Sequence, residues 1–473
     1  MKGWQMKKIV LLWTRLIDSL KALGQPEGKM KLFVDAVMRE LTAHDIDRHI
    51  NGCIGCGNCG HYCLLYLTTN DSKHHPKLKS DFLREIFWRY CTLWGRILGW
   101  LGLTSTPTDQ DLVEKTALYF GEEGCCTMCG RCSLACPQGV NPSRLTFLIR
   151  AGLSAVGIVP ELIAEIRKNA ATTGNSFGLS WDDSMGRAIK DAEKHGLTVP
   201  VGKKGAEWLF PCSAIGTAHH WDKFHIVVAV LQAAGVDFTC SSEISDTGTE
   251  PWTTAVDLSL ARKFATALAE EALRLGCRGV IIGECACDVR IYTIEAADIF
   301  ESRGLEVAYM DALLLEKAQE GALPLKRVKR AVTLHPPCWS VRKTGYGETI
   351  RALLRLCVTD IVEMTPRDGE SFCCSGGAGA MRVWPANRPG RNIRREVAEL
   401  KAAQIRSTGV DLVVTPCATC AMALQDTVEF YNIPAKATLL MQMVYEAMLN
   451  ARSDNARAVP REKTAAGEAV VAA

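Results

Sequence analysis

Most of the 21 cysteines in this 473-residue chain fall into three spaced groups that could hold metal. Two of these groups share the spacing C-x2-C-x2-C-x3-C, and they comprise Cys53, Cys56, Cys59 and Cys63, and Cys126, Cys129, Cys132 and Cys136. This spacing lets one short loop reach three corners of an iron–sulfur cube. Zinc and inert buried thiols are the alternatives, but zinc sites rarely use four cysteines spaced in this way. The two groups therefore predict two [4Fe–4S] clusters.

The spacing is that of bacterial two-cluster ferredoxins, in which the fourth cysteine of each motif ligates the other cube. By this rule, the two ligand sets are Cys53, Cys56, Cys59 and Cys136, and Cys126, Cys129, Cys132 and Cys63. Pro137 follows the second motif as expected, whereas Leu64 stands at the matching place in the first. Cys125 is an additional thiol, and the sequence leaves open whether it or Cys126 binds.

The third group has a different pattern, C-x34-C-C-x42-C-x2-C, and consists of Cys338, Cys373, Cys374, Cys417 and Cys420. Adjacent cysteines do not readily form a disulfide with each other, because the required geometry is strained. Glycines at positions 376, 377 and 379 let backbone amides approach an anionic cluster closely. Five thiols exceed what one cube needs. The group therefore predicts a cluster that is not a cube, and a conventional cube is the alternative.

The elements that must position these thiols change in type along the chain. Before about residue 200, apolar residues recur at helical spacing, notably in 1–50 and in the aromatic and basic stretch 82–102. After about residue 205, short apolar runs alternate with amphipathic stretches, which indicates α/β structure. The expected strands are 208–210, 279–283, 306–310, 331–335 and 411–415. Cys338 and Cys417 each follow such a strand, where open α/β sheets place their ligands.

Residues 205–290 and 331–424 resemble each other, since in both a helix end, a turn and a strand precede a pair of cysteines. A duplicated α/β lobe explains this resemblance, and chance similarity is the alternative. The first copy departs from the full pattern at its cysteines, which are Cys212, Cys240, Cys285 and Cys287. We therefore expect a degenerate lobe that completes the pocket wall without a second non-cubane cluster. Whether any of its cysteines contacts a cluster or substrate stays open.

Composition narrows the class of protein. With 48% hydrophobic and 23% charged residues, the chain is globular rather than disordered or of low complexity. A net charge of +3 is too small to indicate nucleic acid as a partner. The apolar run IVLLW near the N-terminus is too short for a signal peptide, and no stretch reaches the roughly 18 apolar residues of a membrane span. We expect reduced thiols in the cytoplasm.

These motifs resemble the heterodisulfide reductase D-type proteins, which fuse a ferredoxin-like C subunit to a catalytic B subunit. The resemblance covers about residues 45–425. It extends to the K subunits of a membrane complex associated with sulfite reductase, whose insert is similar to LREIFWRYCTLWGR at 83–96. In this family, a sulfur-bridged substrate is cleaved at a non-cubane [4Fe–4S] cluster. The resemblance assigns that cluster here to Cys338, Cys373, Cys374, Cys417 and Cys420.

The resemblance also implies a cofactor set and partners. The expected cofactors are two cubane [4Fe–4S] clusters and one non-cubane [4Fe–4S] cluster. The expected partners are a membrane cytochrome b-type subunit that exchanges electrons with quinol, other electron-transfer subunits, and a small thiol, disulfide or sulfur-carrier protein. The chain would lie peripherally on the inner face of the cell membrane. Neither the direction of electron flow nor the substrate follows from the sequence.

The expected fold class is α+β overall: a helical two-cluster ferredoxin-like N-terminal domain followed by two Rossmann-like α/β cysteine-rich lobes. The predicted segments are an N-terminal helical segment at 1–45, the two-cluster domain at 46–165 with an aromatic insert at 64–124, the first lobe at 205–325, the second lobe with the CCG motif at 326–450, and a disordered tail at 451–473.

Several interpretations compete. An iron–sulfur subunit of a glycolate, lactate or glycerol-3-phosphate oxidase shares the motifs but only relays electrons, and it more often lacks the aromatic insert. A redox sensor or scaffold has little need for five thiolates. The insert either packs between domains or docks on a membrane partner through Trp88, Trp94 and Trp100. Three polar residues near the strand ends are candidates for proton relay or for buried polar contacts: Glu284, Asp288 and His335.

Overall fold

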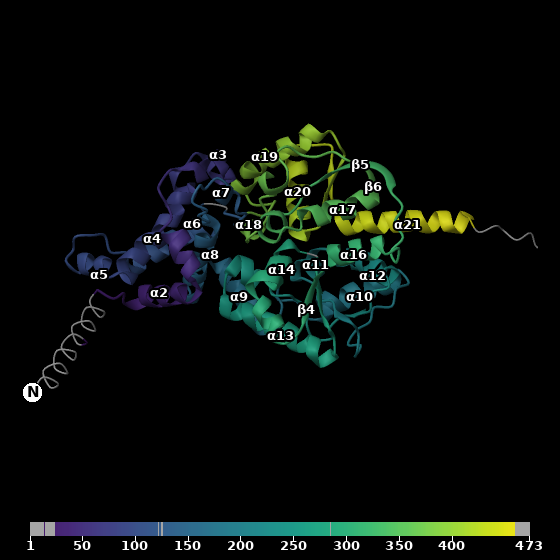
Figure 1. The fold of residues 1–473 in the computed structure, drawn as a ribbon, viewed down its shortest axis with the longest axis horizontal. Coiled ribbons are helices and arrows are strands. Elements are labelled where there is room, and N and C mark those ends of the chain that lie inside the picture. The colour runs from purple at the N-terminus through teal and green to yellow at the C-terminus, as the bar shows by residue number, and fades with distance from the viewer. Residues whose placement is uncertain (1–13, 15–23, 122, 124–125, 284, 459–473) are drawn as a thin grey trace, which may run out of the picture.

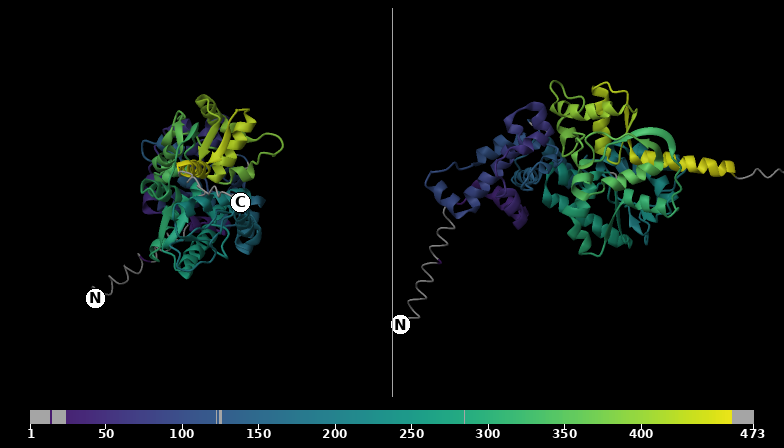
Figure 2. Two further views of the ribbon diagram at one scale, coloured as in Figure 1. Left: turned by 90° about the vertical axis from the view of Figure 1, so that its right-hand side faces the viewer. Right: turned by 45° about the horizontal axis from the view of Figure 1, so that its top comes forward.

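The computed structural model describes residue 14 and residues 24–121, 123, 126–283 and 285–458. A helical N-terminal part lies at one end of an elongated molecule, and two α/β lobes lie side by side at the other (Figures 1 and 2). Apart from Thr14, which is helical, the helix expected before residue 24 falls outside the described residues. The mixture of helices with parallel sheets agrees with the expected α+β class.

The N-terminal part is built from helices alone. They are α2 (Gly28–Glu40), α3 (Leu64–Thr69), α4 (Pro76–Cys91), α5 (Leu93–Trp100), α6 (Asp109–Phe120), α7 (Arg131–Leu134) and α8 (Pro142–Ala155). The next two helices, α9 (Glu161–Thr173) and α10 (Arg187–Lys194), lie against the first lobe instead (Figure 1). Helix α8 is almost entirely buried and packs against α2, α4 and α6. The Asn141 side chain caps it by accepting hydrogen bonds from the backbone N–H groups of Ser143 and Arg144. This cap fixes the chain immediately after the second cysteine motif.

The aromatic stretch 82–102 forms two helices rather than one. Thr92 is extended between α4 and α5, and its side chain accepts a hydrogen bond from the Gly95 N–H at 3.1 Å. The α4 half is packed, with Phe82, Leu83 and Ile86 buried. Apolar spacing alone did not reveal the break, because the side chains remain periodic across it.

The first lobe is a four-stranded parallel sheet with helices around it. Its elements are β1 (Trp208–Leu209), α11 (Ala214–His219), α12 (Phe224–Ala233), β2 (Phe238–Thr239), α13 (Leu258–Leu275), β3 (Gly279–Ile282), α14 (Ala286–Arg290), α15 (Ala297–Glu301), β4 (Glu306–Tyr309) and α16 (Met310–Gln319). The strand order is β2-β1-β3-β4. All four residues of central β3 are buried, as expected for a parallel strand covered on both faces.

The second lobe repeats this topology, with strand order β6-β5-β7-β8. Its elements are β5 (Val328–Leu334), α17 (Gly347–Cys357), β6 (Val358–Ile361), α18 (Ala380–Val383), α19 (Ile393–Thr408), β7 (Leu412–Thr415), α20 (Ala418–Phe430), β8 (Lys436–Leu439) and α21 (Leu440–Ala458). Each of the five predicted strands overlaps an observed strand, whereas β2, β6 and β8 were not predicted. The shared strand order is what a duplicated lobe requires.

In each lobe, the strand order reverses between the first and third strands in sequence. In open α/β sheets, ligands bind in the crevice beyond the carboxyl ends of the strands at such a switch point. In the second lobe, this crevice lies between the ends of β5 and β7, which lead into Cys338 and Cys417. The topology therefore brings these two cysteines to one edge of the sheet.

The two lobes share one apolar core. Helix α21 packs against α12 of the first lobe and α17 of the second, and α16 packs against α17. Helix α21 continues to Ala458, so the segment expected to be disordered after residue 450 begins as helix. Residues 459–473 lie outside the described part of the chain. Among the described helices, none combines the length and apolar character needed to cross a membrane.

Candidate metal centres

The first cysteine cavity lies near the surface. It is lined by Cys53, Cys56, Cys59 and Cys136. Cys56 is exposed. The Val140 N–H donates to the Cys136 Sγ at 3.2 Å, and burial raises the pKa of the Cys59 thiol. Backbone N–H groups directed at sulfur suit a thiolate ligand.

The second cysteine cavity is deeper. It is lined by Cys63, Cys126, Cys129 and Cys132. Burial raises the pKa of the Cys63 thiol to about 12, so metal rather than solvent must stabilise a thiolate there. Lys79 also lines the cavity, and its buried Nζ has no hydrogen-bond partner among the described residues. A buried positive side chain without a counter-charge fits an anionic iron–sulfur cluster.

The two cavities divide the eight cysteines into the same two sets of four that the ferredoxin rule gives. Cys63 lies with the second motif and Cys136 with the first. Cys126 lines the second cavity, while Cys125 lies outside the described residues. The donor types and their burial therefore fit two [4Fe–4S] clusters.

The five cysteines of the third group lie together at the switch point of the second lobe. Cys373 precedes Cys374 directly and interacts electrostatically with Cys338 and Cys374. Cys374 lies 3.3 Å from Cys420, and Cys420 contacts Cys417, which precedes α20. The five sulfurs thus form one continuous row.

Backbone geometry around the Cys-Cys pair favours thiolates. The Ser375 N–H donates to the Cys373 Sγ at 3.3 Å, and the Gly376 N–H donates to the Cys374 Sγ at 3.5 Å. A Cβ on Gly376 would approach the Ala423 Cβ to 2.7 Å, so glycine lets this loop pack directly on α20. Hydrogen bonds from Cys373 and Cys420 hold the pKa of the Cys374 thiol well below its usual range. The loop therefore stabilises negatively charged sulfur.

A sixth thiol from the first lobe joins this row. Cys285 follows β3, the counterpart of β7, and contacts both Cys287 and Cys417. The degenerate lobe therefore supplies a thiol to the wall of the site. Cys212 and Cys240 are buried in the core, and Glu284 lies outside the described residues.

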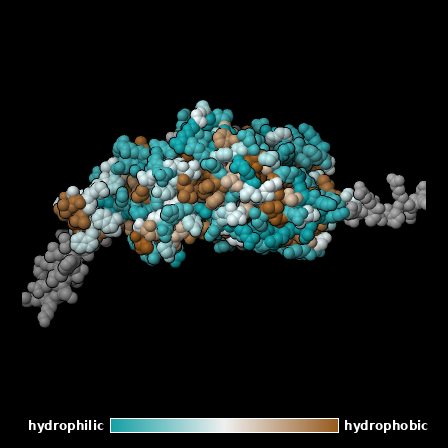
Figure 3. Space-filling view, turned by 90° about the horizontal axis from the view of Figure 1, so that it is seen from above, coloured by the Kyte–Doolittle hydropathy of each residue, from teal (hydrophilic) through white to brown (hydrophobic). Residues whose placement is uncertain are grey.

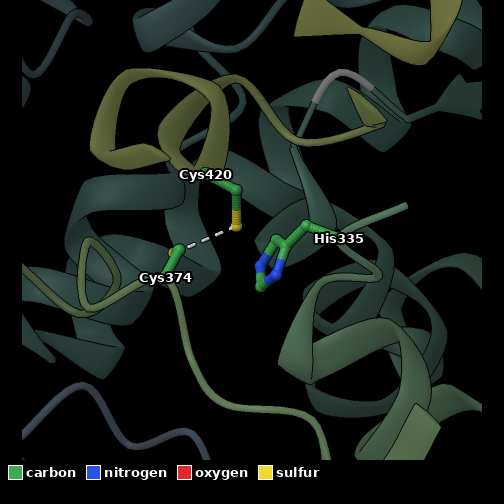
Figure 4. A group of neighbouring side chains, drawn as sticks. All are labelled: His335, Cys374 and Cys420. Atoms are coloured by element: carbon green, nitrogen blue, oxygen red, sulfur yellow. Dashed lines mark hydrogen bonds between the residues drawn. The ribbon is translucent and has the colours of Figure 1, made fainter. Parts of the chain in front are cut away.

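The other two candidates for proton relay differ in their surroundings. Asp288 is buried and accepts hydrogen bonds from the hydroxyls of Thr247 and Thr249, so it makes buried polar contacts. His335 is only 1% exposed, and neither ring nitrogen has a hydrogen-bond partner among the described residues. The ring points toward the Cys374–Cys420 pair (Figure 4). Burial holds the pKa of His335 well below its usual range, which leaves a neutral imidazole.

The second and third cysteine groups touch each other. Cys129 and Cys373 line the same cavity and interact electrostatically, and the Thr127 Oγ1 lies 3.4 Å from the Cys373 Sγ. Arg150 lies almost fully buried beside them and donates to the carbonyl oxygens of Cys126 and Ala378. One guanidinium therefore ties the second cysteine motif to the loop of the Cys-Cys pair.

Two further arginines connect the helical N-terminal part to the second lobe. Arg342 donates to the carbonyl oxygens of Cys129, Gly369 and Ser371. Arg131 donates to the carbonyl oxygen of Glu370. These contacts hold the second and third cysteine groups at a fixed separation.

A cavity of about 180 Å³ lies beside the third group. Gly216 and Lys223 of the first lobe line it, as do Ala437 and Met441 of the second. Pro416 and Ala418 also line it, on either side of Cys417. The cavity gives a small molecule a place next to the cysteine row.

Comparisons with known proteins agree with this arrangement. The cysteine-rich domain called CCG matches residues 332–425. Hdr-like menaquinol oxidoreductase iron-sulfur subunit 2 of Archaeoglobus fulgidus is 25% identical, covering 90% of this chain and 85% of that protein. The D subunit of the dihydromethanophenazine:CoB–CoM heterodisulfide reductase of Methanosarcina mazei is 23% identical, covering 87% of this chain and 96% of that protein.

The chain is similar over most of its length to heterodisulfide reductase-like iron–sulfur subunits. The B subunit of the fumarate reductase (CoM/CoB) of Methanothermobacter marburgensis is also similar, at 24% identity over 81% of this chain and 69% of that protein. The relatives of the heterodisulfide reductase-like type are named as oxidoreductase subunits. The relationship therefore supports an oxidoreductase with an electron-transfer role at the level of the family.

Proposed function

We propose that this chain is the catalytic iron–sulfur subunit of a heterodisulfide reductase-like complex. It would pass electrons between a membrane quinol or cytochrome b partner and a disulfide or trisulfide substrate. The observation that carries this proposal is the contact between Cys129 and Cys373, which joins the second cysteine cavity to the cysteine row. A cluster in the second cavity would adjoin one end of the cysteine row. Electrons could then pass from that cluster to a sulfur substrate bound at the row.

Three cysteine sets would hold the cofactors. Two cubane [4Fe–4S] clusters would occupy the two cavities, and a non-cubane [4Fe–4S] cluster would be held by Cys338, Cys373, Cys374, Cys417 and Cys420. When bound, these groups supply one-electron storage and iron with affinity for substrate sulfur. Together with Cys285, the five cysteines of the third group make six neighbouring thiols. This is more than a cluster that only relays electrons requires.

The reaction balances with quinol as the reductant. Reduction of a disulfide breaks the S–S bond, takes up two electrons and two protons, and forms two thiols. Oxidation of quinol to quinone releases two electrons and two protons. The reverse reaction would form the disulfide and reduce quinone. The relative potentials of the two couples set the direction, since about 30 mV in a two-electron couple corresponds to about 1.4 kcal/mol.

The protein's own residues position and enclose the chemistry. Arg150 and Arg342 fix the second cysteine motif against the loop of the Cys-Cys pair. The cysteines of the third group are buried or half-buried, which limits access of water. We propose that the 180 Å³ cavity beside Cys417 receives the substrate, since walls from both lobes enclose it.

Helix α5 offers a surface for the membrane partner. Trp94 and Trp100 are 69% and 62% exposed, and Leu101 and Leu103 lie exposed after them. Apolar side chains gather at the end of the molecule where this helix lies (Figure 3). Exposed tryptophans on an otherwise folded domain favour an interaction site. We propose that the chain docks peripherally at the cell membrane through this surface, on its cytoplasmic side.

Low-temperature EPR tests the proposed function. Oxidised, iron-loaded protein is mixed with one thiol half of a candidate disulfide, and a new paramagnetic signal is expected. Cys373→Ser and Cys374→Ser should abolish this signal while both cubane signals persist. Cys357→Ser is a matched control, since Cys357 is a buried core thiol that donates to the Leu353 carbonyl. Cubane signals alone, without any response to thiols, would instead indicate an electron relay.

A further inference from the structure

His335 has an unusual environment for a buried histidine. It lies immediately after β5, and its backbone N–H donates to the Val414 carbonyl oxygen at 2.8 Å, which fixes its position at the sheet edge. Its ring is fully buried, yet neither Nδ1 nor Nε2 has a hydrogen-bond partner among the described residues. Buried polar groups in folded proteins normally have partners, so both ring nitrogens are available to a ligand beyond the described side chains.

The His335 ring lies beside two thiols of the cysteine row. A ring nitrogen of His335 and the sulfurs of Cys374 and Cys420 all lie within 4.8 Å of one another (Figure 4). Metal–sulfur and metal–nitrogen bonds are about 2.3 and 2.0 Å long in cysteine and histidine sites. One metal ion can therefore reach all three atoms with small side-chain movements.

Neighbouring polar groups do not compete for the ring. The Lys401 Nζ is buried nearby, but it is held by Gln404 Oε1 at 2.6 Å and Met364 Sδ at 3.5 Å. A neutral imidazole has one nitrogen with a free lone pair, which is the form that ligates metal. The ring is thus oriented, neutral and free to bind.

We propose that His335 is a nitrogen ligand of the third centre, which then has mixed cysteine and histidine coordination. The inference rests on the proposed function only for the presence of an iron–sulfur centre at this site. A neutral imidazole beside the cysteine ligands adds no negative charge at iron, whereas a thiolate in its place would, and histidine ligation goes with a higher reduction potential in Rieske centres. His335 would therefore help to set the potential at the substrate end of the electron path.

Nitrogen hyperfine spectroscopy tests this ligand without changing the chain. Holoprotein is prepared with 14N- or 15N-histidine and poised so that the third centre is paramagnetic. We expect a strong coupling, typical of directly bound nitrogen, that changes with the isotope. A third centre with only weak couplings of the kind seen for distant nitrogens would overturn the proposal.

Two variants and a control extend the test. His335→Gln should abolish the strong coupling, whereas His220→Gln should retain it. His220 is a suitable control because it also has a buried ring nitrogen without a partner among the described residues, but it lines the adjacent 180 Å³ cavity and does not belong to the group of His335, Cys374 and Cys420. His335→Cys should lower the midpoint potential of the third centre, because a thiolate adds negative charge. An unchanged potential in this variant contradicts ligation.

The result separates this inference from the proposed function. A third centre with bound nitrogen that ignores added thiols supports His335 as a ligand and contradicts disulfide chemistry. A third centre that responds to thiols without bound nitrogen supports the function and contradicts the ligand.

Discussion

Cys129 and Cys373 line one cavity and interact electrostatically, although the two belong to different parts of the fold. One comes from the helical N-terminal part and the other from the second α/β lobe. Their contact leaves no protein layer between the second cavity and the cysteine row. In the proposed function, electrons would cross this junction directly between the second and third centres.

Removing one side of this contact should interrupt electron delivery. Cys373→Ala also removes a proposed ligand of the third centre, so it should leave both cubane signals intact while pre-reduced cubes no longer reduce a third centre at the wild-type rate, measured by rapid-freeze EPR. Cys277→Ala removes a buried core thiol away from the junction and serves as the control. Equal rates in Cys373→Ala and the wild-type protein would show that electrons take another path.

Arg150 should contribute strongly to stability. Arg150→Met removes charged hydrogen bonds to the carbonyl oxygens of Cys126 and Ala378 and leaves buried acceptors unsatisfied. We expect the free energy of unfolding to fall by about 3–5 kcal/mol. Anaerobic urea unfolding measures this change. Arg278→Met, at an exposed arginine paired with Glu207 and Glu306, should cost no more than about 1 kcal/mol. Similar losses in both variants would contradict a special role for Arg150.

Asp311 should make stability depend on pH. Burial raises its pKa from 3.8 to about 7 in the folded protein. Between these values the unfolded chain has lost a proton that the folded chain keeps, so the free energy of unfolding decreases as pH rises. The total decrease from this group is about 4 kcal/mol, and it ends above about pH 7.

Asp311→Asn tests this pH dependence, because it keeps the shape of the side chain without a titrating group. Urea unfolding from about pH 4 to about pH 8 should show a flatter profile in the variant. Asp411→Asn, at an exposed carboxylate, should keep the wild-type slope. A wild-type slope in Asp311→Asn would assign the pH dependence to other groups.

Filling the 180 Å³ cavity should impair substrate binding without affecting the cubes. Ala437 is half-buried and lines the cavity, so Ala437→Phe places a ring inside it. A steric cost of about 1–3 kcal/mol corresponds to roughly a tenfold or larger rise in KM. Steady-state kinetics with a small disulfide measures this effect. Ala322→Phe, at an exposed position, should leave KM unchanged, and an unchanged KM in Ala437→Phe would place the substrate elsewhere.

The exposed face of α5 should govern membrane association. Changing Trp94 and Trp100 together to serine removes two large apolar side chains, each contributing about 2 kcal/mol when buried in a partner. We expect binding to membranes that contain the partner subunit to weaken by at least about 100-fold, measured by co-sedimentation. Leu449→Ser, an exposed change on α21, is the control. Unaltered binding in the double variant would contradict docking through α5.

The sequence predicted all four central strands and the edge strand β4, but it missed the edge strands β2, β6 and β8. Buried runs such as GVII in β3 and LVVT in β7 show clearly in composition, because both faces of these strands are covered. The edge strands β6 and β8 have exposed or half-exposed residues and no such signal. Thr92, which separates α4 from α5, acts through one local hydrogen bond that spacing patterns do not show.

The candidate site was predictable where ligands are close in sequence. The spacing rule grouped Cys63 with the second motif and Cys136 with the first, and both cavities have this membership. The contacts of Cys285 with Cys417 and of Cys129 with Cys373 depend on how lobes and domains pack, so no local pattern could reveal them. His335 was recognised as a candidate, but its missing partners are visible only in three dimensions.

The exchange of Cys63 and Cys136 between the two cavities has a consequence for biogenesis. Neither set of four cysteines is complete until both motifs have folded against each other. Metal binding to a site that exists only in the folded state is coupled to folding. In the proposed function, the insertion of the two clusters would then be coupled: a nascent chain with one unfolded motif offers three thiols at one site and a single thiol at the other, so a lesion in either motif would impair both sites.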